Sequence, residues 1–356
     1  MTDFRCFNET TFEPDPTGLT VLRGANGAGK TSILEAIGWL ATGKSIRGAP
    51  REALVRSSAD RAILRAEIAS DERAVLFEAE LPAAGPARVW VNRQPVRRRA
   101  DLVESIRVSV FSPDDLGLVQ GGPAGRRGFL DEALGTSHPR LDATITDVER
   151  ALRQRSALLR QAGRRITAEI GATLDVWDSR LATSGSLLAE ARLALAGSLE
   201  PLVTAAYSRL AGQDGEVRLV YKRSWEGELV DALATSRQDD IRRQTTAVGP
   251  HRDELELWLG RRPARTHASQ GEQRCVALAL RLAAHQLATE RGPTTPILLL
   301  DDVFSELDDQ RSAALVKELP PGQVLLTTAT DPPAAVTPDM VFSIENGELS
   351  CAAGRV

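Results

Sequence analysis

The sequence predicts an α/β fold in which a lobe built on a mixed sheet is interrupted by a mainly helical insertion. An apolar run at 19–22 leads into a glycine-rich loop and a helix-like segment at 32–37. A second apolar run, 296–300, ends in two acidic residues, and long helical patterns lie between the two runs. We therefore expect three parts: an N-terminal part of lobe I (1–110), a helical lobe II (111–245) and a C-terminal part that completes lobe I (246–356).

Composition narrows the class of protein. A chain of 356 residues is long enough for two lobes that each bury a core, and its formal net charge is -4. Uninterrupted apolar stretches stay well short of a membrane span, and the opening segment does not resemble a secretory signal. The three cysteines and four histidines are scattered, without the spacing of a disulfide framework or a zinc site. We expect a cytoplasmic protein.

The loop after the first apolar run matches the phosphate-binding pattern G-x-x-x-x-G-K-[ST]. Its glycines let successive backbone N–H groups point inward, and the following helix adds its positive N-terminal end. Lys30 is expected to reach the terminal phosphates and act in catalysis, and the Thr31 hydroxyl to ligate Mg2+. The sequence therefore predicts a site for ATP and Mg2+, with nucleotide contacts from Gly24, Ala25, Asn26, Gly27, Ala28, Gly29, Lys30, Thr31 and Ser32.

The rest of the N-terminal part is predicted to form β-strands. The segments 61–68 and 74–81 have strand patterns and are separated by a polar turn at 70–73, and a third segment, 88–91, leads into a turn at 92–95. This pattern predicts a meandering antiparallel sheet.

After a short apolar strand at 108–111 the pattern becomes helical through 128–210. Apolar residues recur at steps of three, four and seven, which predicts two long amphipathic helices that pack together, the second about 45 Å long. A strand at 216–222 ends the region. The apolar positions are Leu141, Ile145, Val148, Leu152 and Leu159 in the first helix, and Leu174, Trp177, Leu181, Leu188, Leu195, Leu199 and Leu202 in the second.

The second apolar run predicts a buried strand that delivers two carboxylates, a Walker B arrangement. Asp301 is expected to bind Mg2+, and Asp302 to orient or deprotonate the attacking water. A strand running into an acidic loop is the alternative interpretation of this run on its own. The phosphate-binding loop elsewhere in the chain favours the Walker B interpretation.

A further anion site is predicted where 268–274 leads into a helix at 275–284. A plain helix cap is the alternative interpretation of Ser269. The order of this segment, the acidic pair and Ser305–Asp308 resembles the signature loop, Walker B motif and D-loop of ABC-type ATPases. That resemblance implies a homodimer with two shared sites, in which one subunit closes over ATP held by the other through Ser269, Gln270, Gly271 and Gln273.

Arginine dominates the basic residues. Of 44 lysines and arginines only four are lysines, which leaves 44 − 4 = 40 arginines. Arginine suits phosphate contact, although a GC-rich genome, which replaces lysine by arginine throughout its proteins, would give the same composition. The arginines cluster at Arg93 with Arg97–Arg99, at Arg126–Arg127, at Arg150, Arg153, Arg155, Arg160 and Arg164–Arg165, and at Arg261, Arg262 and Arg265.

The spacing of the motifs narrows the family. Lys30 and Asp301 lie 271 positions apart. A head interrupted by such a long insertion resembles the SMC-like DNA-maintenance ATPases, yet this insertion is too short for their very long coiled coil. The chain resembles the RecF family of bacterial recombination mediator ATPases from end to end. The matching segments are Asp3–Arg5, Leu40–Gly43, Phe111–Val119, Gly121–Arg127, Gln154–Arg155, Ala157–Arg160, Leu174–Trp177, Val248–Leu255, Ala268–Arg274 and Leu298–Asp308.

This resemblance implies an ATP-dependent switch on DNA. Members of the family dimerise with ATP, engage duplex DNA near single-strand gaps, and help to load recombinase with RecO and RecR in gap repair and the SOS response. A weak, DNA-stimulated ATPase resets the switch. Arg5, Arg126 and Arg127 are secondary candidates for phosphate or DNA contact.

Two departures from the ABC pattern bear on hydrolysis. Asp302 is one methylene shorter than the usual glutamate, which predicts turnover slower than about 10 per second. The segment 325–331 lacks the switch histidine, so Thr328, Thr330 or Asp331 is expected near the γ-phosphate. The alternatives are an SMC-like or ABC-type ATPase with another partner, and a nucleotide-gated DNA clamp with negligible hydrolysis.

Overall fold

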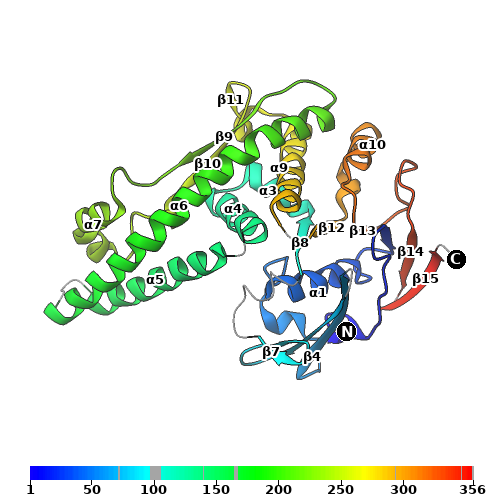
Figure 1. Cartoon of the computed structure of the whole chain (residues 1–356), viewed down its shortest axis with the longest axis horizontal. Helices are drawn as coiled ribbons and strands as arrows, with labels where there is room; N and C mark the ends of the chain where they lie inside the picture. The colour runs from blue at the N-terminus through cyan, green and yellow to red at the C-terminus, as the bar shows by residue number, and fades with distance from the viewer. Residues whose placement is uncertain are drawn as a thin grey trace. The chain divides into compact units, whose positions relative to one another are not determined.

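The computed structural model describes residues 1–70, 73–96, 106–138, 140–163, 167–292, 294–345 and 347–354, and Figure 1 traces the chain. It divides the protein into two compact units. The first comprises Met1–Asp115, Arg209–Gln213 and Arg281–Val356, and the second comprises Leu116–Ser208 and Asp214–Leu280.

The division between the units differs from the expected one. It falls after Asp115 instead of 110, and after Leu280 instead of 245. The second difference has a clear cause, because strands β9 (Val217–Lys222) and β10 (Glu254–Leu259) pair along their whole length. That antiparallel pairing keeps the chain on both sides of 245 in the second unit.

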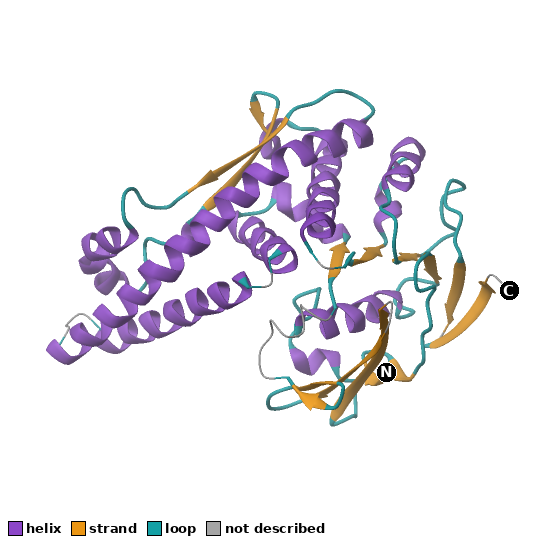
Figure 2. Cartoon of the chain, in the orientation of Figure 1, coloured by secondary structure: helices purple, strands orange, loops and turns teal. Residues whose placement is uncertain are grey.

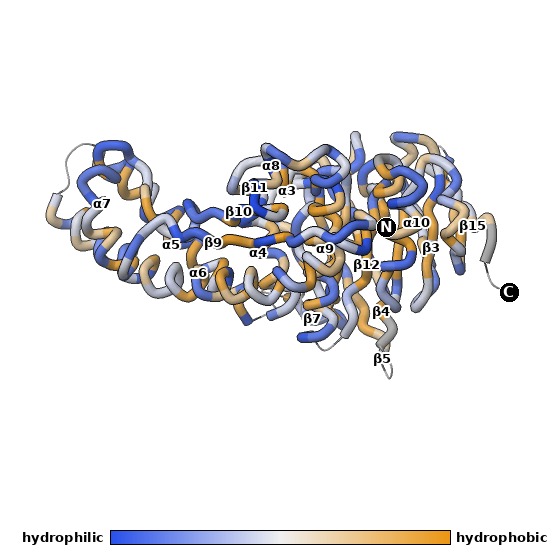
Figure 3. The backbone as a smooth tube through the Cα atoms, turned by 90° about the horizontal axis from the view of Figure 1, so that it is seen from above, coloured by the Kyte–Doolittle hydropathy of each residue, from blue (hydrophilic) through white to orange (hydrophobic). Residues whose placement is uncertain are grey.

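The first unit is built on a six-stranded sheet with the order β15-β14-β3-β13-β12-β8. Its neighbours are parallel except for β14 and β15. Strands buried on both faces need continuous apolar runs, which appear as hydrophobic segments in Figure 3. The strands are β3 (Leu19–Arg23), β8 (Val108–Phe111), β12 (Ile297–Asp301), β13 (Val324–Thr328), β14 (Met340–Glu345) and β15 (Glu348–Gly354).

A second sheet in this unit confirms the predicted meander. Its order is β2-β1-β4-β5-β6-β7, and all its pairs are antiparallel. Part of the predicted turn at 70–73 lies outside the described residues. The strands are β1 (Thr2–Phe4), β2 (Phe7–Glu9), β4 (Arg61–Ser70), β5 (Arg73–Pro82), β6 (Arg88–Val91) and β7 (Gln94–Pro95).

Helix α1 (Lys30–Thr42) shares one hydrophobic core with both sheets. Its Ile33, Leu34 and Trp39 are buried with Phe77 of β5 and Leu299 of β12. Figure 2 shows the helices and strands by colour. The first unit also contains η1 (Arg51–Leu54), η2 (Pro113–Asp115), η4 (Val303–Glu306) and α10 (Asp309–Glu318).

The second unit is mainly helical, as predicted. The second long helix has 44 residues, and at 1.5 Å per residue it runs about 66 Å, longer than expected. No helix in the described part of the chain is both long and apolar enough to cross a membrane. The remaining elements are α3 (Leu116–Gln120), α4 (Pro123–Ser137), α5 (Leu141–Ala162), α6 (Ala168–Ala211), α7 (Leu229–Arg243), η3 (Pro250–Arg252), β11 (Arg262–Pro263), α8 (Ala264–His267) and α9 (Gln270–Arg291), which continues into the first unit.

A buried arginine joins three helices of this unit. Arg155 of α5 is fully buried, and its Nε donates to Asp178 Oδ1 of α6 at 2.5 Å. Its Nη1 lies 2.8 Å from Asp240 Oδ2 of α7 and donates to Thr246 Oγ1 at 2.9 Å. Asp240 is also fully buried. The guanidinium therefore neutralises two carboxylates that would be costly to bury alone.

We expect Arg155→Leu to lower the free energy of unfolding by about 3–5 kcal/mol, because the fully buried Asp240 loses the arginine it pairs with and Asp178 keeps only the more distant Arg237, at 3.9 Å. Arg153→Leu is the matched control on the same helix. Arg153 is mostly exposed and lies 3.7 Å from Glu149, so its loss should cost less than about 0.5 kcal/mol. Urea unfolding compares the two variants, and equal changes in unfolding free energy would contradict this account.

Candidate functional site

The phosphate-binding loop connects β3 to α1 at the carboxyl edge of the parallel sheet. Gly27 and Gly29 have φ values of 82° and 114°, which other residues rarely adopt. A Cβ on Gly29 would lie 2.8 Å from the Phe7 ring, and one on Gly24 would lie 2.5 Å from the Ile344 carbonyl oxygen. Backbone conformation and close packing thus both require glycine in this loop.

Lys30 begins α1 and turns its side chain back over the loop. Its Nζ donates to the carbonyl oxygens of Gly24 at 2.7 Å and Ala25 at 3.0 Å, and the residue is only 7% exposed. Burial lowers the pKa of the Lys30 ammonium, while the carboxylates of Asp302 and Asp301 oppose that shift. The loop, the lysine and the acidic pair therefore form one electrostatic site.

Asp301 ends β12 and faces the loop. Its Oδ1 accepts hydrogen bonds from Thr31 Oγ1 at 2.7 Å and Thr327 Oγ1 at 2.7 Å. Asp301 is 8% exposed. The structure thus brings together the two residues that the sequence assigns to Mg2+, from positions far apart in the chain.

Asp302 follows in a left-handed conformation, with φ 48° and ψ 32°, and is half-buried. Its backbone N–H donates to the carbonyl oxygen of Thr327 at 3.2 Å and to Thr327 Oγ1 at 3.0 Å. Sequence reasoning missed Thr327. The available signal was a polar pair, Thr327–Thr328, that ends an otherwise apolar strand beside the acidic pair.

The donor set fits Mg2+ when phosphate oxygens complete it. Mg2+ prefers oxygen ligands and in nucleotide sites takes one or two from the protein. The Thr31 hydroxyl and the Asp301 carboxylate supply such oxygens. Among the described residues no group of three His, Cys, Asp or Glu side chains could hold a metal alone, so nucleotide phosphates would have to contribute.

The end of β13 lies against the loop. The Thr328 carbonyl oxygen accepts from the Gly24 N–H at 3.3 Å, and Thr328 Oγ1 donates to the Thr330 carbonyl oxygen at 2.9 Å. The Asp331 side chain is 80% exposed and pairs with Arg23. Of the three residues expected near the γ-phosphate, Thr328 has the most direct link to the loop, and its role stays a prediction.

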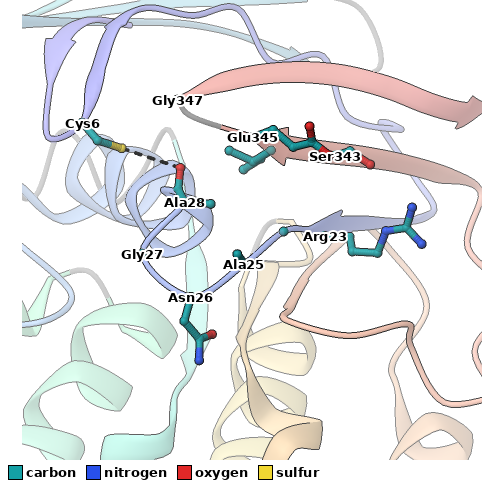
Figure 4. A pocket seen from close by; sticks show the side chains of 11 residues that line it. Cys6, Arg23, Ala25, Asn26, Gly27, Ala28, Ser343, Glu345 and Gly347 are labelled. Atoms are coloured by element: carbon teal, nitrogen blue, oxygen red, sulfur yellow. Dashed lines mark hydrogen bonds between the residues drawn. The ribbon is translucent and has the colours of Figure 1, made fainter.

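A cavity of about 650 Å3 lies beside the loop in the first unit (Figure 4). Residues 24–28 form one wall, and Ser343, Ile344 and Glu345 of β14 form another with Gly347 of the β14–β15 turn. Cys6 and Arg23 complete the lining. Its volume is in the range of small-molecule sites.

The predicted signature residues lie in the second unit, at the start of α9. The Ser269 N–H donates to Glu272 Oε2 at 2.7 Å, and the Glu272 N–H donates to Ser269 Oγ at 3.3 Å, which is a capping box. Ser269 and Gln270 are exposed, and Gly271 is half-buried. The Ser269 hydroxyl also donates to Glu272 Oε2 at 2.8 Å. Ser269 is therefore a helix cap, and its role as a nucleotide contact stays a prediction.

Gln273 does not share that exposure, and its role as a nucleotide contact stays a prediction. It is 6% exposed, and its Nε2 donates to the carbonyl oxygens of Ala264 at 3.1 Å and Arg265 at 3.0 Å. Its Oε1 accepts from Gln120 at 2.7 Å. The side chain thus stabilises the interior of the second unit.

The interpretation of Arg5 and Arg126 as DNA contacts is corrected. Arg5 forms a bidentate pair with Glu35, with N···O distances of 2.7 and 2.9 Å. Arg126 is 6% exposed and forms a bidentate pair with Glu254, with both N···O distances 2.9 Å.

Arg127 donates to the carbonyl oxygen of Asp253 at 2.7 Å. Arg97–Arg99 and Arg164–Arg165 lie outside the described residues. Sequence shows residue type but not partners, which is why structural arginines were taken for ligand contacts.

The fold and the site define a nucleotide-binding head of the RecF/RecN/SMC class, whose N-terminal domain model matches residues 1–346. A Streptomyces avermitilis protein named DNA replication and repair protein RecF is 43% identical, with 93% of this chain and 92% of that protein covered. A Frankia alni protein of the same name is 42% identical, with 100% and 97% covered. The chain belongs to the RecF family of DNA replication and repair proteins.

Two solved structures have a similar fold. The structure titled as the recombination mediator protein RecF-ATP in the RecFOR pathway has a TM-score of 0.89 and 25% identity, and covers 99% of this chain and 96% of its own. An Smc head bound to the C-winged helix domain of ScpA, at 18% identity, 98% and 94% coverage and a TM-score of 0.59, shares the fold alone.

We expect Lys30→Met to weaken ATP binding about 10- to 100-fold, because the ammonium that faces the phosphates is lost. Lys44→Met is the control, since Lys44 is an exposed lysine just after the same helix. Titration with a fluorescent ATP analogue measures both affinities. Equal affinity of Lys30→Met and wild type would refute the assignment of this loop.

Proposed function

We propose that this protein is an ATP-dependent DNA-binding switch of recombinational gap repair and the SOS response. Membership of the RecF family and the likeness to an ATP-bound relative support that function. One observation carries the mechanism: the phosphate-binding loop and Asp301 form one half-site in the first unit, while the second unit presents an exposed serine at a helix N-terminus. Each half offers donors to phosphate, and neither encloses it.

ATP joins two copies of the chain in this proposal. The phosphates bound by one copy attract the N-terminus of α9 from the other, where backbone N–H groups and Ser269 donate hydrogen bonds. A ligand that binds the dimer and not the separate chains stabilises the dimer by mass action. The dimer then holds duplex DNA near a single-strand gap.

Hydrolysis releases the dimer. Asp302 lies next to Lys30 and Asp301, where it would orient the attacking water, and Mg2+ would polarise the terminal phosphate. The aspartate is one methylene shorter than glutamate, so its carboxylate reaches less far toward that water. We propose a weak, DNA-stimulated ATPase with turnover below about 10 per second.

The partners proposed are RecO and RecR, because the solved relative is placed in the RecFOR pathway. Duplex DNA would contact exposed arginines and not the paired Arg5 and Arg126. The short acid Asp302 also favours a second candidate, a nucleotide-gated clamp with negligible hydrolysis. Phosphate release measured with and without gapped duplex separates the two: DNA-stimulated release supports the ATPase, and its absence supports the clamp.

The function is tested through Ser269→Arg. We expect wild-type protein to double the 38.4 kDa mass of one chain when ATP is added, and to bind gapped duplex more tightly with ATP than without. Ser269→Arg should bind ATP as the wild type does and remain a single chain, because the bulky side chain blocks closure over the phosphates.

Light scattering measures the mass, and Thr183→Arg is the control because it adds the same charge to an exposed position of α6. ATP-driven dimers of Ser269→Arg would contradict the proposed role of the loop that contains Ser269. A wild-type protein that neither dimerises with ATP nor binds DNA would remove the function.

A further inference from the structure

Thr327 is a buried polar residue between the two Walker B acids. It lies in β13, directly opposite Asp301 in the register of the parallel pair β12–β13. The residue is 0% exposed. Neighbouring residues opposite one another in a sheet point to the same face, which places the Thr327 hydroxyl and the Asp301 carboxylate side by side.

The chemistry of each group determines which atom donates in the two hydrogen bonds of the Thr327 hydroxyl. A threonine hydroxyl has one proton, and Thr327 Oγ1 uses it to donate a hydrogen bond to Asp301 Oδ1 at 2.7 Å. Its lone pairs are then free to accept, and one receives the Asp302 N–H at 3.0 Å. A single hydroxyl thus contacts the side chain of one acid and the backbone of the next.

These two hydrogen bonds restrain the rotation of the Asp301 carboxylate and the backbone conformation of Asp302. Asp301 Oδ1 is held between the hydroxyls of Thr31 and Thr327, which fixes the plane of the carboxylate. Asp302 adopts φ 48°, a left-handed conformation that residues other than glycine seldom hold without support. The hydrogen bonds from its N–H to Thr327 supply that support.

We propose that Thr327 is a positioning residue that sets the orientation of both acids, Asp301 for Mg2+ and Asp302 for the attacking water. The inference rests on the proposed use of MgATP at this site. Groups that orient a metal ligand typically change metal affinity 10- to 100-fold when they are lost. A purely structural threonine would affect stability and leave the Mg2+ dependence unchanged.

The test compares Thr327→Val, which keeps the shape and removes the hydroxyl, with Thr327→Ser, which keeps the hydroxyl. Thr20→Val is the matched control, because Thr20 is another fully buried threonine of the same sheet, on β3, and accepts from the Asp15 N–H at 3.0 Å. Two quantities are measured: the Mg2+ concentration that gives half-maximal binding of a fluorescent ATP analogue, and the rate of phosphate release.

We expect Thr327→Val to raise the half-maximal Mg2+ concentration about tenfold or more and to slow release about tenfold. Its affinity for the analogue without Mg2+ should stay within about twofold of wild type, and Thr327→Ser should restore both quantities. Thr20→Val should match the wild type. Wild-type values for Thr327→Val, or equal shifts for Thr20→Val, would overturn the proposal.

Failure of the proposed function gives a different result, because a wild type that binds MgATP but neither dimerises nor binds DNA would remove that function and leave the comparison of Thr327→Val with wild type unchanged. A wild type without ATP binding at any Mg2+ concentration would remove both. A wild type that binds but does not hydrolyse ATP would remove the ATPase alone. The role of Thr327 would then be decided by the Mg2+ midpoint for binding.

Discussion

The hydrogen bond from Thr31 to Asp301 is the interaction on which the rest of the site depends. It spans 2.7 Å and joins residues 270 positions apart. Strands β3, β13 and β12 are parallel neighbours, so the loops at their carboxyl ends meet at one edge. The intervening sequence folds mostly as a second unit, and it returns the chain to the same sheet, where Asp301 lies beside the phosphate-binding loop.

Local motifs and secondary structure could be predicted from the sequence, whereas contacts between residues far apart in the chain could not. The phosphate-binding loop, the β4–β6 meander and the long helices follow from glycine placement and apolar periodicity. Pairing of β9 with β10 depends on contacts between distant segments, so the boundary at Leu280 was missed. Arg126 was misread for the same reason, because its partner Glu254 lies 128 positions away.

Ser269 illustrates how one local structure serves folding and ligand binding together. Its capping box with Glu272 satisfies backbone groups at the start of a 22-residue helix. The same helix start is exposed, and a helix N-terminus favours a negative group. The cap therefore stabilises the second unit, and in the proposed dimer the same helix start would meet the phosphates bound by the other copy of the chain.

The central claim is that each nucleotide site is shared by two copies of the chain, and mixing two defective variants tests it most directly. Each variant is labelled in separate batches with a donor and an acceptor fluorophore, and ATP is added at a concentration that saturates the wild type but not Lys30→Met. Energy transfer between donor-labelled and acceptor-labelled chains reports dimers. A shared site predicts no transfer for either variant alone and ATP-dependent transfer for the mixture, because one loop and one signature serine remain intact in a mixed dimer. No transfer in the mixture, or ATP-driven transfer between Lys30→Met chains alone, would contradict the account.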